Sequence, residues 1–189
     1  MNTGYLSKIE IERIGFKSVG DNVFISSKAC FYLTEKISIG NNVRIDDFCL
    51  LIGNVSIGDS VHIGAYSAIH ASYGSVVIKN FTNISSRVTI YAVSDDYSGK
   101  TLTSSLISDI YKNLSIGNVV IEKFAIIGTG STILEKAYIA EGTAIGAMSL
   151  VTKKMDAWSV YAGIPCVKIS DRSKELLSIY EQYRRDLDK

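Results

Sequence analysis

Residues 39–69 read IGNNVRIDDFCLLIGNVSIGDSVHIGAYSAI, and an aliphatic side chain returns in this stretch at every sixth position. The recurring residues are Ile39, Ile45, Leu51, Ile57, Ile63 and Ile69. Outward from this stretch, the same interval links Val19, Ile25 and Phe31 on one side and, on the other, Ile78, Ile84 and Ile90, then Ile121, Ile127, Ile133, Ile139, Ile145 and Val151. A fixed internal period is typical of a solenoid whose repeats stack on one another.

A second pattern accompanies the first. Gly directly follows many of the aliphatic residues, and a small or β-branched residue lies four positions after most of them. Because side chains alternate along a strand, both positions face inward, and six residues make one wall and one corner. We expect segments such as 40–42 and 58–60 to form corners, since Gly, Asn and Asp tolerate positive φ. The small inward positions are Val43, Cys49, Val55, Val61, Ser67, Thr82, Val88, Ala125, Ser131, Ala137, Thr143 and Ser149.

An antiparallel β-sandwich is the alternative fold, because its strands also alternate and end in Gly-rich turns. Its turns usually recur at intervals of about 8 to 12 residues, whereas the period here stays at six. The period therefore favours an all-β parallel β-helix. It does not determine the handedness, since parallel crossovers are generally right-handed.

The composition indicates one main domain and excludes several functions. Twenty basic and 19 acidic residues nearly cancel, without the dense Lys/Arg patch of a nucleic-acid-binding protein. The N-terminus lacks the apolar core of a signal peptide, and no apolar run approaches the roughly 18 residues of a membrane span, so we expect a soluble cytoplasmic protein. Cys30, Cys49 and Cys166 are expected to be reduced packing residues, and with two histidines and no CxxC pair we expect no metal site.

The repeat array resembles that of the hexapeptide-repeat acyltransferases. The resemblance covers about residues 14–170 and extends to the closing segments 146–154 and 158–165, the latter ending in a small-Gly-x-Pro turn. It implies a left-handed parallel β-helix, a homotrimer and an acyl-coenzyme A co-substrate, most simply acetyl-CoA. We expect this β-helix over residues 1–170, with an active-site loop at 92–118.

Residues 171–189 leave the repeat and are expected to form a C-terminal α-helix. Leu176, Tyr180, Tyr183 and Leu187 are spaced as on one helical face. We expect this helix to cap the open end of the solenoid or to pack on a neighbour, because an uncovered end exposes strand edges.

Two shorter segments, 41–49 and 91–99, resemble a narrower group. They are similar to N-acyltransferases that acylate the amine of a nucleotide-linked 4-amino-4,6-dideoxyhexose, the thymidine-diphosphate sugars used for surface polysaccharide such as O-antigen. The resemblance implies that Asp95, and Ser85 ten positions earlier, lie near the sugar amine. Many sugar O-acetyltransferases instead carry a catalytic His in this loop, and here no His follows His70.

The period breaks between Ile90 and Ile121 for a polar stretch that is too long for a corner. Long loops in compact domains are usually functional or disordered, and we interpret this one as the active-site loop. Asp95 is the candidate to orient or deprotonate the amine, and Asp96 would raise its pKa by repulsion if both were partly buried. The alternative is that both are solvated turn formers before Gly99.

Three further residues are candidates near the reaction. Ser85 occupies a corner, where its hydroxyl would contact the amine or the sugar, or would simply replace a corner Gly. His70 precedes an interruption of the period at 71–74 and lies one coil before Tyr91, at the root of the loop, so it is the reserve base or a structural residue. His62 is interpreted as a solvated surface residue.

The remaining candidates are assigned to binding. Arg44, Asp46, Asp47, Asp96 and Tyr91 are assigned to the nucleotide-linked sugar, with an ion network on the coil surface as the alternative for the first three. Coenzyme A is assigned three groups of residues. The small residues Gly128, Thr129, Gly146 and Ala147 would leave room for pantetheine. The phosphates would meet Lys153, Lys154 and Lys168, and the adenine would rest on Ile164 and Pro165.

These residues predict an acyl-CoA-dependent N-acyltransferase acting on a nucleotide-linked amino sugar. A sugar O-acetyltransferase is the alternative enzyme, and a non-catalytic β-helix scaffold is the alternative of another class. A phosphate-binding GxxxxGK loop and an HExxH motif are both absent from the sequence.

Overall fold

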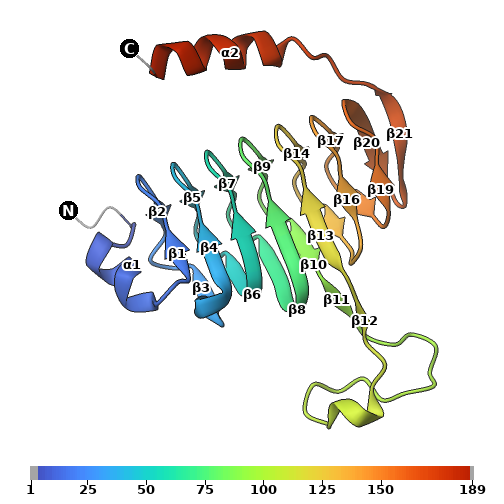
Figure 1. Ribbon diagram of the computed structural model, residues 1–189. Coiled ribbons are helices and arrows are strands. Elements are labelled where there is room, and N and C mark those ends of the chain that lie inside the picture. Colours follow the sequence, from blue (N-terminus) through green and yellow to red (C-terminus); the bar gives the residue numbers. More distant parts are fainter. Residues whose placement is uncertain (1–3, 188–189) are drawn as a thin grey trace.

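The computed structural model describes residues 4–187 and shows a parallel β-helix with three walls (Figure 1). Outside this range lie residues 1–3, which we assigned to the β-helix, and residues 188–189, which we assigned to the C-terminal helix. Wall 1 contains β1 (Ser18–Val19), β4 (Ile37–Ile39), β13 (Asn118–Ile121), β16 (Tyr138–Ile139) and β19 (Lys154–Met155). Wall 2 contains β2 (Phe24–Ile25), β5 (Arg44–Ile45), β7 (His62–Ile63), β9 (Asn83–Ile84), β14 (Ile126–Ile127), β17 (Ala144–Ile145) and β20 (Ser159–Gly163). Wall 3 contains β3 (Cys30–Tyr32), β10 (Thr89–Tyr91), β15 (Thr132–Ile133) and β18 (Leu150–Val151).

Two long strands, β6 (Leu50–Ile57) and β8 (Ala68–Ile78), begin on wall 3 and bend onto wall 1. The pairing register keeps equivalent residues of successive coils opposite each other, as in Leu51 with Ile69 and Ile69 with Ile90. The six-residue period therefore places each aliphatic side chain directly on the next, and the predicted parallel β-helix is confirmed.

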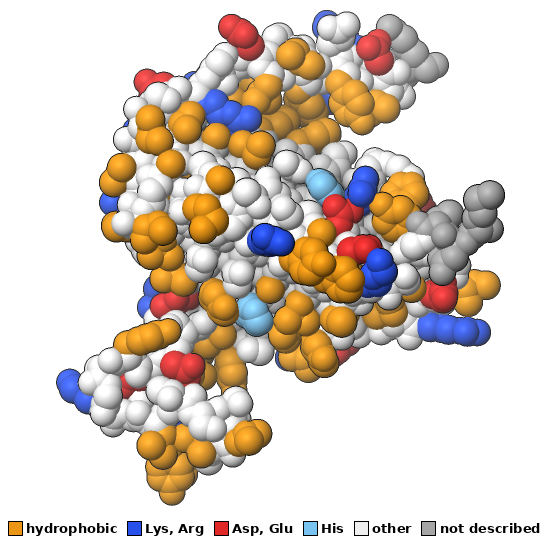
Figure 2. All heavy atoms as spheres, turned by 180° about the vertical axis from the view of Figure 1, so that it is seen from behind, with side chains coloured by type: hydrophobic (Ala, Val, Ile, Leu, Met, Phe, Trp, Pro, Cys, Tyr) orange, Lys and Arg blue, Asp and Glu red, His pale blue; other side chains and the backbone are white. Residues whose placement is uncertain are grey.

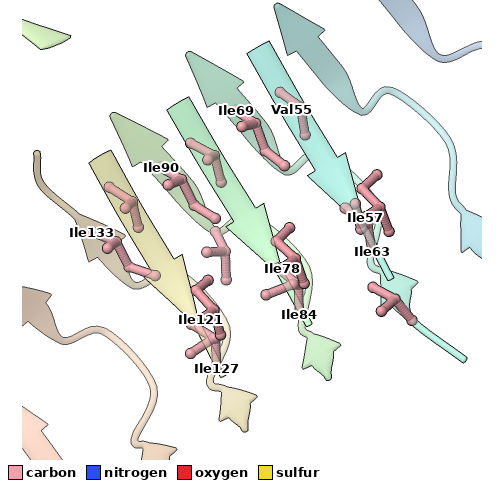
Figure 3. Packing of buried hydrophobic residues seen from close by; sticks show 14 of the residues in the cluster. Val55, Ile57, Ile63, Ile69, Ile78, Ile84, Ile90, Ile121, Ile127 and Ile133 are labelled. Carbon is pink, nitrogen blue, oxygen red and sulfur yellow. The ribbon is translucent and has the colours of Figure 1, made fainter. Parts of the chain in front are cut away.

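The core is the stack of these inward residues along the solenoid axis (Figure 3). Ile63, Ile84 and Ile127 on wall 2 are fully buried, and all twelve small inward positions named from the sequence are buried. Cys49 acts as a compact filler, and burial raises the pKa of its thiol to about 11. Cys166 is also buried, whereas Cys30 is exposed.

The glycines that follow the aliphatic residues are not the left-handed corner residues, which corrects our expectation. Gly40 and Gly128 lack positive φ, but a Cβ on Gly40 would lie 2.7 Å from Gly58 C and one on Gly128 2.4 Å from Ala147 N. Gly is needed there because neighbouring coils approach closely. The left-handed residue comes two positions later, and it is Asn42 or Ser60 but also bulky Phe48, Tyr66, Phe81, Arg87, Phe124, Met148 and Trp158.

The break in the period forms an excursion from the solenoid. β11 (Val93–Ser94) pairs antiparallel with β12 (Ser115–Ile116), and the chain between them includes the 3-10 helix η2 (Asp109–Tyr111). Figure 1 shows this loop projecting away from the body of the β-helix. Its apolar side chains are strongly exposed, with Tyr97 at 93% and Leu106 at 94%.

The N-terminal end carries a helix that the period did not predict, α1 (Lys8–Ile14). Ser7 and Glu10 form a reciprocal capping box, a sequence signal that identifies such a helix. A second short helix, η1 (Thr34–Lys36), precedes β4.

The C-terminal helix is present but does not cap the open end. After β21 (Cys166–Asp171), which runs antiparallel to β20, the helix α2 (Leu176–Leu187) returns along the side of the solenoid (Figure 1). Tyr180 contacts the rings of Phe81 and Phe124, each with centroids 5.0 Å apart, at corners joining walls 1 and 2. Arg172 fixes the approach by donating to the carbonyls of Phe124 and Gly142, both at 2.9 Å. The helix α2 therefore packs against these aromatic corner residues on the side of the solenoid. The last strands of the solenoid at this end are β20 and β21.

Candidate active site

The candidate residues gather on two edges of the prism. Edge A joins wall 2 to wall 3 and contains residues 46–48, 64–66, 85–87, 128–130 and 146–148. Edge B joins wall 3 to wall 1 and contains residues 53–54, 71–74, 92–117, 134–136 and 152–153. Wall 3 separates the two edges.

The N-terminal half of edge A carries a charged network. Asp46 accepts a hydrogen bond from Arg44 Nε at 2.7 Å and lies 2.8 Å from His62 Nε2. The other ring nitrogen of His62 lies 3.1 Å from Asn83 Oδ1. His62 lies at the surface as expected, with its side chain 41% exposed, but it also has polar partners, because its outward position on β7 lies between polar residues of the adjacent strands. Sequence spacing contained that signal, since Arg44, His62 and Asn83 share one register.

Asp47 belongs to a separate ion pair on the same edge. Lys28 Nζ lies 2.7 Å from its carboxylate, and Ser26 also donates to it. Hydrogen bonds from Lys28 and then Ser26 lower the pKa of Asp47. The ion network considered for Arg44, Asp46 and Asp47 is thus present, and it orders the surface to which the sugar or nucleotide is assigned.

Ser85 lies at the middle of edge A. Its backbone is held on both sides, by Ser67 Oγ donating to its carbonyl at 3.0 Å and by its own N–H donating to Ile127 O at 2.9 Å. Within residues 4–187 its hydroxyl has no hydrogen-bond partner, and the residue is partly exposed. Ser85 thus presents to solvent a hydroxyl that no group within residues 4–187 engages, on a backbone held by hydrogen bonds.

The C-terminal half of edge A is made mostly of small residues. Gly128, Thr129, Gly146 and Ala147 lie on the two coils above Ser85, in paired register. Thr129 Oγ1 donates to Ser86 O at 2.7 Å and fixes this coil to that of Ser85. The structure therefore places four residues assigned to the acyl donor directly beside Ser85, along one edge.

His70 and Tyr91 lie next to each other where wall 3 reaches edge B. Their rings are stacked with centroids 4.8 Å apart and an interplanar angle of 10°. Burial lowers the pKa of His70, which favours the neutral imidazole. His70 thus has the protonation state of a base, although its ring packs flat on Tyr91.

Asp95 and Asp96 follow β11 and differ in environment. Asp95 is exposed, and within the described residues its carboxylate accepts no hydrogen bond. Asp96 accepts from Ser98 N at 2.8 Å and Thr101 Oγ1 at 2.9 Å, and hydrogen bonds from Ser98 and Thr101 lower its pKa. Asp96 is therefore a turn former, and the partly buried pair that we considered is not present in the isolated chain.

Three residues missed by the sequence interpretation tie the loop to the insertion at 71–74. Lys112 Nζ lies 2.8 Å from Asp109, whose other oxygen accepts from Tyr73 Oη at 2.9 Å. The Lys112 side chain is only 9% exposed, and Asp95 contributes to the raised pKa of this ammonium after Asp109. The clamp connects the insertion at 71–74 with the loop, a contact that no short-range pattern reveals.

The residues assigned to phosphates and adenine do not form one site in the single chain. Lys153 lies on edge B, Lys154 lies on wall 1 with its ammonium 5.4 Å from the Tyr138 ring centre, and Lys168 pairs with Asp171 at 2.7 Å. Ile164 and Pro165 form the exposed turn between β20 and β21, and Ile164 is 72% exposed. The three lysines project from different parts of the chain, and their assignment to the phosphates of coenzyme A stays a prediction.

Residues 4–187 show neither a metal-binding cluster nor a membrane-spanning helix. These residues contain no group of three His, Cys, Asp or Glu side chains arranged to hold a metal ion. No helix within them has the length and apolar character needed to cross a membrane.

A parallel β-helix with small residues and free polar groups along its edges defines a class, the hexapeptide-repeat transferases. The family model described as bacterial transferase hexapeptide (six repeats) matches residues 36–71. The dTDP-4-amino-4,6-dideoxy-D-glucose acyltransferase of Escherichia coli is 46% identical over 183 residues, which cover 95% of each chain. The N-acyltransferase AntD from Bacillus cereus, solved with dTDP and 3-hydroxybutyryl-CoA, is 43% identical and superimposes with a TM-score of 0.96 over 98% of this chain and 99% of its own.

Further structures of AntD carry single substitutions of one aspartate, or of a serine ten positions before it. One serine variant was solved with dTDP-4-amino-4,6-dideoxyglucose and coenzyme A, at a TM-score of 0.94 and 43% identity over 97% of this chain and 98% of its own. The present chain belongs to the family of hexapeptide-repeat acyltransferases.

Proposed function

We propose that this enzyme transfers an acyl group from acyl-CoA to the amine of a dTDP-linked 4-amino-4,6-dideoxy sugar. The observation that carries the proposal is the match along nearly the whole chain to enzymes named for this sugar nucleotide or solved with it. Ser85 and Asp95 show the ten-residue spacing of the serine and aspartate substituted in AntD. We further propose a cytoplasmic role in supplying sugars for surface polysaccharide.

The reaction requires a neutral amine next to a thioester. The amine nitrogen bonds to the carbonyl carbon, the carbon–sulfur bond breaks, and coenzyme A leaves as thiolate, which takes up the proton released from nitrogen. Asp95 is suited to orient the amine or to accept its proton first, because its carboxylate is free. The unpaired Ser85 hydroxyl is suited to donate to the developing oxyanion or to bind the sugar.

The two edges require a second copy of the chain. Between Ser85 and Asp95 the chain crosses wall 3 as the extended strand β10, at about 3.3 Å per residue, so the two side chains point from opposite edges of one prism. We propose a homotrimer in which edge A of one subunit faces edge B of the next. The exposed apolar residues of the projecting loop, among them Tyr97, Leu106 and Ile110, would then be covered.

Edge A orders the two substrates along the solenoid. The small residues above Ser85 leave room for the extended pantetheine of the donor, while the charged network below Ser85 offers polar groups to a nucleotide-linked sugar. Ser85 lies between these halves, where the amine and the thioester would meet.

The decisive experiment follows free thiol release from acetyl-CoA and longer acyl-CoAs with dTDP-linked 4-amino and 3-amino sugars and with matched sugars carrying a hydroxyl instead. We expect release with the 4-amino acceptors and an amide in the product by mass spectrometry. Release with hydroxyl acceptors alone would establish the O-acetyltransferase alternative. Binding of coenzyme A without turnover of any acceptor would reject the proposed substrate.

A further inference from the structure

A column of small side chains lies inside edge A, one on each coil just before the chain enters wall 3: Cys49, Ser67, Val88, Ser131 and Ser149. None of these residues is more than 2% exposed. Ser67 lies between the two histidines in the sequence, and both histidines are visible in pale blue on the surface in Figure 2, whereas Ser67 is buried in the core. A substrate therefore does not touch the column, and any effect of its members on the reaction passes through other residues.

The hydroxyl of Ser67 makes two hydrogen bonds to the corner of the next coil. It donates to the carbonyl oxygen of Ser85 at 3.0 Å and accepts from the backbone N–H of Val88 at 3.2 Å. These two residues are the ends of the corner between β9 and β10. One hydroxyl thus ties together both ends of the corner that carries Ser85, which requires a group that donates and accepts at once.

The backbone of Ser85 depends on Ser67 for one of its two anchors. The N–H of Ser85 donates to the carbonyl of Ile127 at 2.9 Å, so the coil above holds the peptide group that precedes the Ser85 side chain. Among the residues that the structure describes, Ser67 is the partner that holds the carbonyl on the other side. Loss of the Ser67 hydroxyl therefore frees the peptide group that follows Ser85.

We propose that Ser67 is a positioning residue for the acyl transfer and acts through Ser85. The inference rests on the proposed function, in which the hydroxyl of Ser85 meets the substrates. A reacting group has to be held in place within a fraction of an ångström, and a misplacement of about 1 Å costs on the order of a hundredfold in rate. Because Ser67 holds the backbone of Ser85 and not the substrates, its loss lowers kcat and leaves KM nearly unchanged.

Ser131 provides a matched comparison within the same column. Its hydroxyl donates to the carbonyl of Gly146 at 3.0 Å and accepts from the N–H of Ser149 at 3.2 Å, the same pair of bonds at the same distances. Ser131 is as deeply buried as Ser67. Removal of either hydroxyl deletes equivalent bonds from the core, but only the loss of Ser67 disturbs the corner of Ser85.

The test measures thiol release from acetyl-CoA with a dTDP-linked 4-amino sugar. We expect Ser67→Ala to lower kcat about tenfold or more, and Ser131→Ala to keep the wild-type kcat although the two variants melt at similar temperatures. Ser67→Thr should retain most of the rate, because it keeps the hydroxyl and because Val88 shows that a β-branched side chain fits the column. In a Ser85→Ala background, Ser67→Ala should lower the residual rate no further, since nothing is left to position.

Crystal structures of the two alanine variants give a readout that does not depend on activity. The hydroxyl of Ser85 should be displaced in Ser67→Ala and should stay in place in Ser131→Ala. Equal losses of kcat in these two variants would overturn the proposal, as would a full effect of Ser67→Ala in the Ser85→Ala background or an unmoved Ser85. A wild-type enzyme that releases no thiol with any acceptor would instead overturn the proposed function.

Discussion

Ser85 and Asp95 each keep a polar group without a partner in residues 4–187, although their neighbours are hydrogen-bonded. Ser86 contacts Thr129, and Asp96 closes its own turn through Ser98. A group that forms no bond within the protein is available to a substrate, whereas a bonded neighbour supports the backbone. By this criterion Ser85 and Asp95 are candidates for the reaction, whereas Ser86 and Asp96 stabilise the local backbone.

We expect Asp95→Asn to lower kcat by about a hundredfold or more, because the amide can neither accept the amine proton nor balance an ammonium. KM for acyl-CoA should remain near the wild-type value, since Asp95 is assigned to the amine and not to the donor. Asp96→Asn is the control with the smaller expected effect on rate, and initial rates of thiol release measure both. An Asp95→Asn enzyme with unchanged kcat would transfer the role of base to His70, whose imidazole is favoured in its neutral form.

The loop between β11 and β12 is an element without its own core. Apart from its short 3-10 helix it has no packed face, and its position depends on Tyr73, Asp109 and Lys112. The Lys112 side chain is 9% exposed, whereas the Asp109 side chain is 61% exposed, so solvent still screens this ion pair. Asp95 directly follows β11, which pairs with β12, and the contacts of Tyr73, Asp109 and Lys112 tie the rest of the loop to the insertion at 71–74.

We expect Lys112→Ala to loosen the loop and to lower kcat several-fold while the β-helix remains folded. Limited proteolysis should cut the loop faster in this variant, and circular dichroism should show unchanged strand content. Lys100→Ala is the matched control, because Lys100 lies exposed on the same loop and has no carboxylate partner within the described chain. Equal cleavage rates and kcat in the two variants would show that the clamp does not position Asp95.

At the scale of the molecule, a continuous prism carries its candidate groups on two separate edges. The core stack fixes the distance between the edges, because each coil repeats the one below it. No rearrangement of a single chain brings edge A to edge B without breaking the stack. The proposed homotrimer would bring the two edges together, because a cyclic assembly provides the same contact for each subunit.

Mixing Ser85→Ala chains with Asp95→Asn chains tests this arrangement. If one subunit supplies Ser85 and the next supplies Asp95, random reassociation restores both residues in about one quarter of the sites. We expect activity to recover toward that fraction after unfolding and refolding of an equimolar mixture, with a trimeric mass by light scattering. The activity of the two variants refolded separately is the baseline. A refolded mixture that is no more active than this baseline would show that both residues act within one chain.

The sequence by itself determined the solenoid. A six-residue period leaves little freedom, because each inward aliphatic residue can be buried only by the coils above and below, and every small inward position named from the period is buried. The family motifs likewise predicted Ser85, Asp95 and the small residues 128, 129, 146 and 147 without knowledge of their positions in space.

Only the tertiary structure decided which residues meet. His62 with Asp46, Lys112 with Asp109 and Tyr73, and Phe48 with Tyr66 are contacts between coils or across an insertion. Such contacts depend on the register of stacked coils and on the path of a loop, which a one-dimensional period does not specify. The course of α2 along the side of the solenoid depended on aromatic corner residues in the same way. The period is local and repeats, and therefore can be found in the sequence, whereas contacts between coils and across the loop arise only when the chain folds.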